Sequence, residues 1–89
     1  MLQLSVKSER ALTTRSLADL RRGQHGVLDH LDLPEDQALR LMELGFLPGA
    51  RISVARSAPG GDPRVYRVDG SEFGLRRETA SHLILRDPE

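Results

Sequence analysis

The hydrophobic residues near the middle of this chain recur with the period of a helix. The apolar face that this spacing produces over residues 34–44 consists of Ala38, Leu41 and Met42, widened by Leu39 and Leu44. A proline opens the segment and two acidic residues follow it, which suits a first turn and the positive end of the helix dipole. The pattern predicts one helix of about three turns.

The residues after this helix predict a tight reversal of the chain. Gly45 is placed to end the helix in a left-handed conformation, and Phe46 would then fold back on Leu41. Pro48 and Gly49 fit the two central positions of a type II turn, where the second position needs a positive φ.

The other segments show the alternation and the turn residues of short strands. Strands are expected at residues 24–31, 51–54, 64–68, 71–75 and 82–86. The first alternates imperfectly, which predicts a bulge, and Asp69-Gly70 predicts a type I′ hairpin turn. Short helical turns are expected at residues 17–22, with Ser16 as N-cap and Gly23 as the stop, and at residues 76–81. The two prolines and two glycines of residues 58–63 predict a loop.

About five short strands and one longer helix predict a mainly β protein, a small and strongly bent barrel. Closure is favoured because it hides strand edges that an open sheet would expose. A chain of 89 residues is expected to form one domain. We place this domain at residues 16–86, with residues 1–15 as an N-terminal tail or loosely attached strand and residues 87–89 as a C-terminal tail.

Composition argues against several classes of function. The 13 basic residues balance the 13 acidic ones, whereas nucleic-acid-binding modules usually carry a basic excess, so nucleic acid is not an expected partner. The chain has no cysteine, which excludes disulfides and thiolate metal sites and fits a cytoplasmic location. No apolar run approaches the ~18 residues of a membrane span, and the first residues do not resemble a signal peptide. We expect no enzyme, because no nucleophile elbow, phosphate loop or helix with paired histidines is present.

Charge is nevertheless distributed unevenly along the chain. Residues 29–43 hold five acids and one base, whereas residues 51–86 hold seven arginines and four acids. Opposed charge patches can orient a protein partner, although an ordinary solvated surface would look the same in sequence. Only three aromatic residues are present, so a groove for proline-rich ligands is not expected. Pairing of a partner strand with an exposed sheet edge, or packing against exposed leucines, stays open.

The histidines are the candidates for a metal site. His25 and His30 are five residues apart on a predicted strand, which places them on opposite faces if the strand is regular. If the first and last strands are neighbours, His82 would meet one of them, with Asp29 or Asp32 as a carboxylate ligand; this donor set suits Zn or divalent Fe. The alternatives are plain surface histidines, or a metal shared between the two chains of a homodimer.

Several motifs, taken in order, resemble those of the FeoA family of ferrous-iron transport proteins. The matching segments are LADLRRG at 17–23, RLMELGFLPGA at 40–50, SAPGGDP at 57–63, LRRETA at 75–80 and LIL at 83–85. They keep the family's order and spacing. The sequence departs from the family at Gly60, where a bulky aliphatic residue is common, and in its longer N-terminal segment.

The resemblance implies an SH3-like barrel and a cytosolic accessory protein that binds FeoB, a membrane ferrous-iron transporter with a cytoplasmic GTPase domain. It supplies no catalytic residue and no agreed metal ligand. We expect the partner to contact Arg40, Leu47, Pro59, Gly60, Gly61, Asp62, Pro63, Arg76 and Arg77. We expect the fold itself to depend on Leu41, Gly45, Pro48, Gly49, Gly70 and Leu85.

Overall fold

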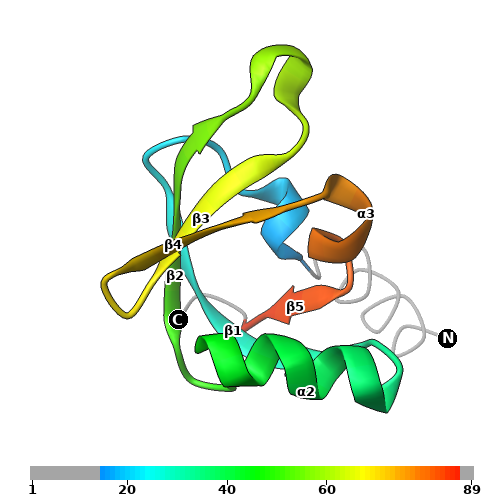
Figure 1. Cartoon of the computed structure of the whole chain (residues 1–89). Coiled ribbons are helices and arrows are strands. Elements are labelled where there is room, and N and C mark those ends of the chain that lie inside the picture. Colours follow the sequence, from blue (N-terminus) through cyan, green and yellow to red (C-terminus); the bar gives the residue numbers. More distant parts are fainter. Residues whose placement is uncertain (1–14, 87–89) are drawn as a thin grey trace, which may run out of the picture.

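The computed structural model describes residues 15–86 (Figure 1). The segments expected at residues 1–15 and 87–89 lie outside the described residues, apart from Arg15. In chain order the elements are η1 (Leu17–Asp19), β1 (His25–Leu31), α2 (Glu35–Leu44), β2 (Arg51–Ser57), η2 (Pro59–Gly61), β3 (Arg64–Val68), β4 (Ser71–Leu75), α3 (Arg77–Ala80) and β5 (Leu83–Leu85). The expected helix and five strands are therefore present.

The five strands form one antiparallel sheet in the order β4-β3-β2-β1-β5. The register of β1 against β5 shifts between Leu28 and His30, which is the bulge that the imperfect alternation predicts. A second shift lies between Val54 and Arg56 in β2. Such bulges increase the local bend of a strand, and the sheet curls around a common interior (Figure 1).

The mainly β fold class is confirmed, but the ladder stays open where closure was expected. Among residues 15–86, β4 and β5 are the two edges, and the helical turn α3 joins one to the other (Figure 1). The last residue of α3, Ala80, is fully buried and packs in the core, so α3 lies against the interior between the two edge strands. The edge of β5 receives further pairing, since Ser16 bridges Ile84 and the Leu85 amide donates to the Arg15 carbonyl at 2.8 Å.

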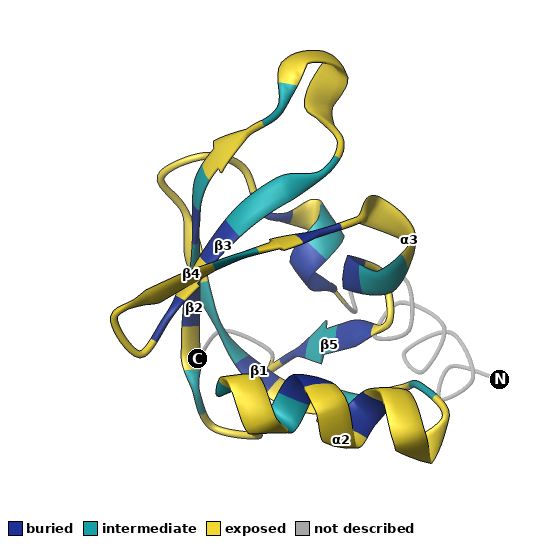
Figure 2. Ribbon diagram, viewed as in Figure 1, coloured by how far each residue is buried: buried dark blue, intermediate teal, exposed yellow. Residues whose placement is uncertain are grey.

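One hydrophobic core fills the curl of the sheet. Its largest fully buried side chains are Tyr66, Phe46, Leu17, Leu20, Leu28, Ile52, Leu83 and Val68. Figure 2 shows these buried segments on the inner faces of the strands and in η1. Phe46 packs against Phe73 with ring centroids 5.9 Å apart, a tilted arrangement that aromatic pairs favour.

The helix α2 covers the core with a narrower face than the sequence suggests. Only Ala38 and Leu41 are buried, whereas Leu39 and Leu44 are 51 % and 42 % exposed. The expectation that both leucines widen the buried face is wrong, because one side of α2 borders solvent rather than a second layer (Figure 2). Within residues 15–86 no helix has the length and apolar character that a membrane crossing requires.

The first helical turn is also shorter than expected. Ser16 caps it as predicted, and its hydroxyl accepts from the Ala18 amide while Asp19 bonds back to the Ser16 amide. The turn ends at Asp19 rather than continuing to residue 22, because Leu20 is extended (ψ 144°) and is itself 1 % exposed. Burial of Leu20 in the core outweighs the local helical pattern.

Candidate functional site

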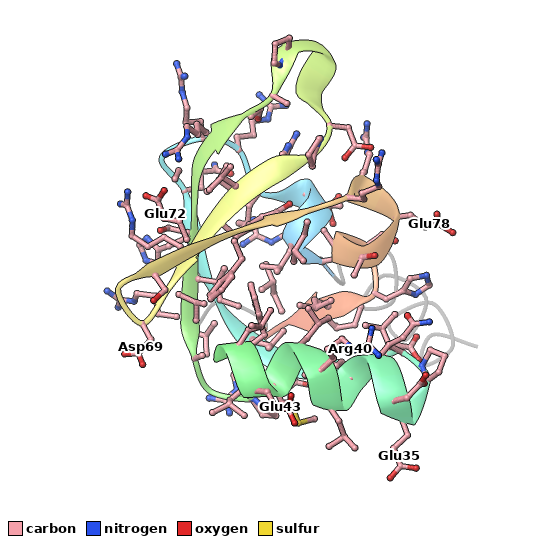
Figure 3. All side chains as sticks on the ribbon, in the orientation of Figure 1. Glu35, Arg40, Glu43, Asp69, Glu72 and Glu78 are labelled. Carbon is pink, nitrogen blue, oxygen red and sulfur yellow. The ribbon has the colours of Figure 1, made fainter. Side chains whose placement is uncertain are left out.

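A groove runs between α2 and the segment from β4 to α3. Its volume is about 320 Å³, and its lining residues are Gln37, Arg40, Leu41 and Leu44 on one side and Gly74, Leu75, Arg76 and Thr79 on the other. In the view of Figure 1, α2 crosses the bottom of the picture while β4 and α3 pass above it. Figure 3 shows Arg40 on the side of α2 toward the strands and Glu35 pointing away from them.

The periodicities of the two walls bring these side chains together. On α2 the lining residues are spaced by three and four positions, which places them on one helical face. On β4, Phe73 and Leu75 point toward the core and Gly74 toward the opposite face. A Cβ on Gly74 would meet no atom within 4 Å, so the space on that face of β4 is open.

The groove carries positive charge. Arg40 and Arg76 are its only ionisable lining residues, and no carboxylate among residues 15–86 lies within 4.0 Å of either guanidinium. The arginines of the strand face differ, because Arg56 and Arg67 both pair with Glu72, at 3.0 and 2.6 Å. The hydrogen bond from Arg67 lowers the pKa of Glu72 below its ordinary value, helped by the charge of Arg56.

The outer edge of β4 borders the same groove. β4 pairs with β3 from Ser71 to Leu75, and no other described strand pairs with it. Outside that ladder, the structure of residues 15–86 gives the backbone of β4 no further backbone partner. An unpaired strand edge is a template for an added strand.

A second hollow continues the groove along α2. Its volume is about 350 Å³, and Gln37 and Thr79 line both hollows. At its far end lie Glu78 and His82. We call the groove and this second hollow together the trough. Its charge changes from positive near Arg40 to negative near Glu78.

The other residues expected to contact a partner fall at two further places. Leu47, 48 % exposed, lines a separate hollow with Arg51 and Asp69. The loop from Pro59 to Pro63 extends from the end of the sheet, at the top of Figure 1. Its last part meets α3, since the Arg77 amide donates to Asp62 Oδ1 at 2.8 Å.

The histidines do not gather into one metal site. His25 begins β1 opposite Ser53, whereas His30 pairs with Ile84 near the other end of β1. The His82 carbonyl accepts from the Asp32 amide at 2.7 Å, but its side chain lines the trough with Glu78. In the part of the chain that the structure describes, no three histidine, aspartate or glutamate side chains converge. The described residues of one chain thus do not bring together the three or four ligands of a zinc site.

His30 nevertheless has one ordered partner. Its Nδ1 lies 2.7 Å from Asp29 Oδ2, and both side chains are about half exposed. A carboxylate at Nδ1 fixes the ring and leaves Nε2 facing away from it, which is the usual support of a metal-ligating histidine. This pair supplies one ligand position.

Sequence reasoning found two of the eight lining residues of the groove, Arg40 and Arg76. It missed Leu75 at the base of the groove, Leu44 at its border and Gly74 on β4. A leucine at the end of an amphipathic helix was the available signal, but it was interpreted as part of the core. Whether a half-exposed leucine faces the core or a groove depends on what packs beside the helix.

The family model and a fused relative both match this chain to the FeoA domain. A family model for the FeoA domain matches residues 15–87. The fusion protein of Porphyromonas gingivalis named "Fe(2+) transport protein A/Fe(2+) transporter FeoB" is 33 % identical over 67 residues, which are 75 % of this chain. The match spans 8 % of the length of that fusion protein.

Solved structures show the same fold. The iron(II) transport protein A of Clostridium thermocellum is similar with a TM-score of 0.73 and 27 % identity, covering 79 % of this chain and 44 % of that one. The zinc-complexed FeoA of Stenotrophomonas maltophilia, described as an SH3 domain protein, has a TM-score of 0.69 and 29 % identity, covering 80 % of this chain and 88 % of that one.

Proposed function

This chain belongs to the FeoA family, and on that premise we propose that it is a cytoplasmic accessory protein of ferrous-iron uptake that acts by binding the cytoplasmic domain of a FeoB-type transporter. The observation that carries the proposal is the relative in which the two proteins are named as one fused chain. Fusion holds two modules at a high effective concentration, which is useful when they act in contact.

The chemistry of the described surface supports a binding role rather than catalysis. The two charged groups of the groove are guanidiniums, which donate hydrogen bonds and accept none. Guanidiniums are not among the side chains that usually serve as general acids or bases. Guanidiniums are instead suited to forked contacts with carboxylates. We propose that residues 16–86 form the binding unit.

Binding to the purified cytoplasmic domain of the transporter tests the proposal. The chain should be retained by the immobilised domain, with guanine nucleotide present or absent, and an unrelated small SH3-like domain of similar charge serves as the control. Lack of retention in both nucleotide conditions would remove the proposal. The same measurement with GTP turnover as a second readout separates activation of the GTPase from assembly alone.

A metal-responsive module is the second candidate, and the exposed His30–Asp29 pair favours it. A similar protein is described as complexed with zinc. The described residues of one chain offer too few converging ligands, so such a site would be shared between two chains of a homodimer, each contributing His30 and a second ligand.

Light scattering during titration with zinc or ferrous iron tests this second candidate. A metal-bridged dimer should double the measured mass, and His30→Ala should abolish the change, while His25→Ala serves as the matched control. A constant mass together with unshifted histidine resonances would exclude it.

A further inference from the structure

We propose that the groove between α2 and β4 binds an extended segment of the partner that carries a carboxylate flanked by aliphatic residues. The segment would lie along the outer edge of β4 and place its carboxylate between Arg40 and Arg76. This inference rests on the proposed function, since it names the surface and the chemistry by which the transporter would be bound.

The charge of the groove selects an acidic ligand. Arg40 comes from α2 and Arg76 from the end of β4, so one carboxylate between them would meet guanidiniums from both walls. Among residues 15–86 neither arginine has a carboxylate within 4.0 Å, in contrast to Arg56 and Arg67. Arginine forks are preorganised for carboxylates, so little conformational freedom is lost on binding.

The floor of the groove selects aliphatic neighbours of that carboxylate. Leu41 and Leu75 are almost buried at its base, and Leu44 at its border is 42 % exposed. Aliphatic side chains that cover Leu44 would remove apolar surface from water at about 25 cal/mol per Å². Exclusion of water there also strengthens the contacts of the two arginines.

The backbone of β4 selects an extended segment rather than a helix. β4 is the sheet edge that no described strand covers, while the opposite edge, β5, already pairs with residues 15 and 16. A helix has no free backbone groups along its length to offer, whereas an added strand satisfies those of β4. Gly74 lines the groove and has no side chain, so it places no bulk beside this stretch of β4.

The remaining surfaces fit a partner less well. The hollow at Leu47 contains one charge of each sign, Arg51 and Asp69, and borders no strand edge of the sheet. The turn from Pro59 to Gly61 has no charged residue and no buried apolar residue. The groove and the hollow that continues it also fix the orientation of the bound segment. An acidic residue of the segment would lie at the Arg40 end, and a basic residue would lie at the Glu78 end.

Charge reversal tests the inference with the purified cytoplasmic domain of the transporter as the probe. The Arg40→Glu and Arg76→Glu double variant should bind at least about tenfold more weakly, and added salt should weaken binding of the unmodified chain. Arg22→Glu is the matched control, because Arg22 is an exposed arginine outside the groove; its affinity should change less than about twofold. Circular dichroism and melting curves verify that each variant is folded.

Amide hydrogen exchange provides the second readout. Amides of Ser71–Leu75 in β4 should exchange more slowly in the complex, as an added strand requires. Equal affinity of the double variant, or protection confined to the loop Pro59–Pro63, would overturn the inference while leaving the proposed function standing. If the substitutions alter self-association in light scattering instead, the groove holds a second copy and the inference is wrong. An unmodified chain that does not bind the domain contradicts the proposed function itself.

Discussion

At the scale of single residues, Gly45 determines how α2 joins the core. Its φ is 114°, a left-handed conformation that side chains disfavour. The Gly45 amide donates to the Met42 carbonyl and the Phe46 amide to the Leu41 carbonyl, at 3.0 and 3.1 Å. This is the Schellman arrangement, and it directs the fully buried Phe46 into the core. The position of the groove wall therefore depends on one backbone conformation.

We expect Gly45→Val to lower the free energy of unfolding by roughly 1 kcal/mol or more, because a β-branched residue is strained in a left-handed conformation. The added Cβ itself would lie 3.7 Å from Val68 Cγ1, an ordinary contact, so the Cβ causes backbone strain and no clash of its own. Urea denaturation measures the change. Gly45→Asn is the control, since asparagine tolerates this conformation better. Equal midpoints for the valine variant and the unmodified chain would contradict the account.

At the scale of elements, the turn η1 is held to the sheet by side chains of β3. The Tyr66 hydroxyl donates to the Leu17 carbonyl at 3.2 Å, and Arg64 donates to the carbonyls of Ala18 and Leu20. The Leu17 carbonyl also accepts the Leu20 amide at 3.1 Å, whereas the carbonyls of Ala18 and Leu20 lie at the end of the short helix, where backbone partners are lacking. Burial raises the pKa of Tyr66 above its ordinary value, and the charge of Arg64 only partly opposes this.

Stability should therefore fall at high pH. In the unfolded chain Tyr66 ionises near pH 10, whereas in the folded chain its pKa is higher. The contribution of protonated Tyr66 to the free energy of unfolding is complete below the pKa that it has in the unfolded chain. This contribution is lost as the pH rises through the higher pKa that it has in the folded chain.

Tyr66→Phe should lower the free energy of unfolding by about 1 kcal/mol at neutral pH, because one hydrogen bond to Leu17 is lost. The substitution should also remove the part of the stability loss at alkaline pH that comes from ionisation of Tyr66. Denaturant unfolding at neutral and alkaline pH measures both effects, and tyrosinate absorbance reports this residue alone because the chain has one tyrosine. Ionisation of Tyr66 at its ordinary pKa would disprove the argument.

At the scale of the whole molecule, the open ladder leaves the strand edge on which the proposed binding surface depends. Closure between β4 and β5 would pair the edge of β4 and leave no strand template beside α2. Instead α3 joins the two strands and leaves the outer edge of β4 beside the groove (Figure 1). One compact sheet thus carries an apolar core inside and, as far as residues 15–86 show, an unpaired edge outside.

Covalent linkage should compensate for a weakened groove. We expect a flexible link between this chain and the transporter's cytoplasmic domain to restore the protection of β4 amides in the Arg40→Glu and Arg76→Glu double variant. The reason is that a short linker supplies an effective concentration of about 1 mM, which favours the bound state of a weakened interface. Hydrogen exchange of the linked and unlinked pairs measures the effect, and the double variant linked to an unrelated domain is the control. Unprotected β4 amides in both linked proteins would contradict the prediction.

The sequence by itself determined the local features of this protein. Three local features match what their residue types predict. They are the helix cap at Gly45, the hydrogen-bonded turn with a φ of 93° at Gly49, and the hairpin turn with φ of 51° at Asp69 and 80° at Gly70. These features depend on φ preferences and on hydrogen bonds between near neighbours, which a few residues specify.

Only the tertiary structure decided which distant residues meet. It brings Arg40 and Arg76 to one groove, places β4 at an edge, and separates His25 from His30 and His82. The physical reason is that strand order and helix docking follow from burial of the whole core. Local periodicity states which face of an element is apolar, but not what lies opposite it.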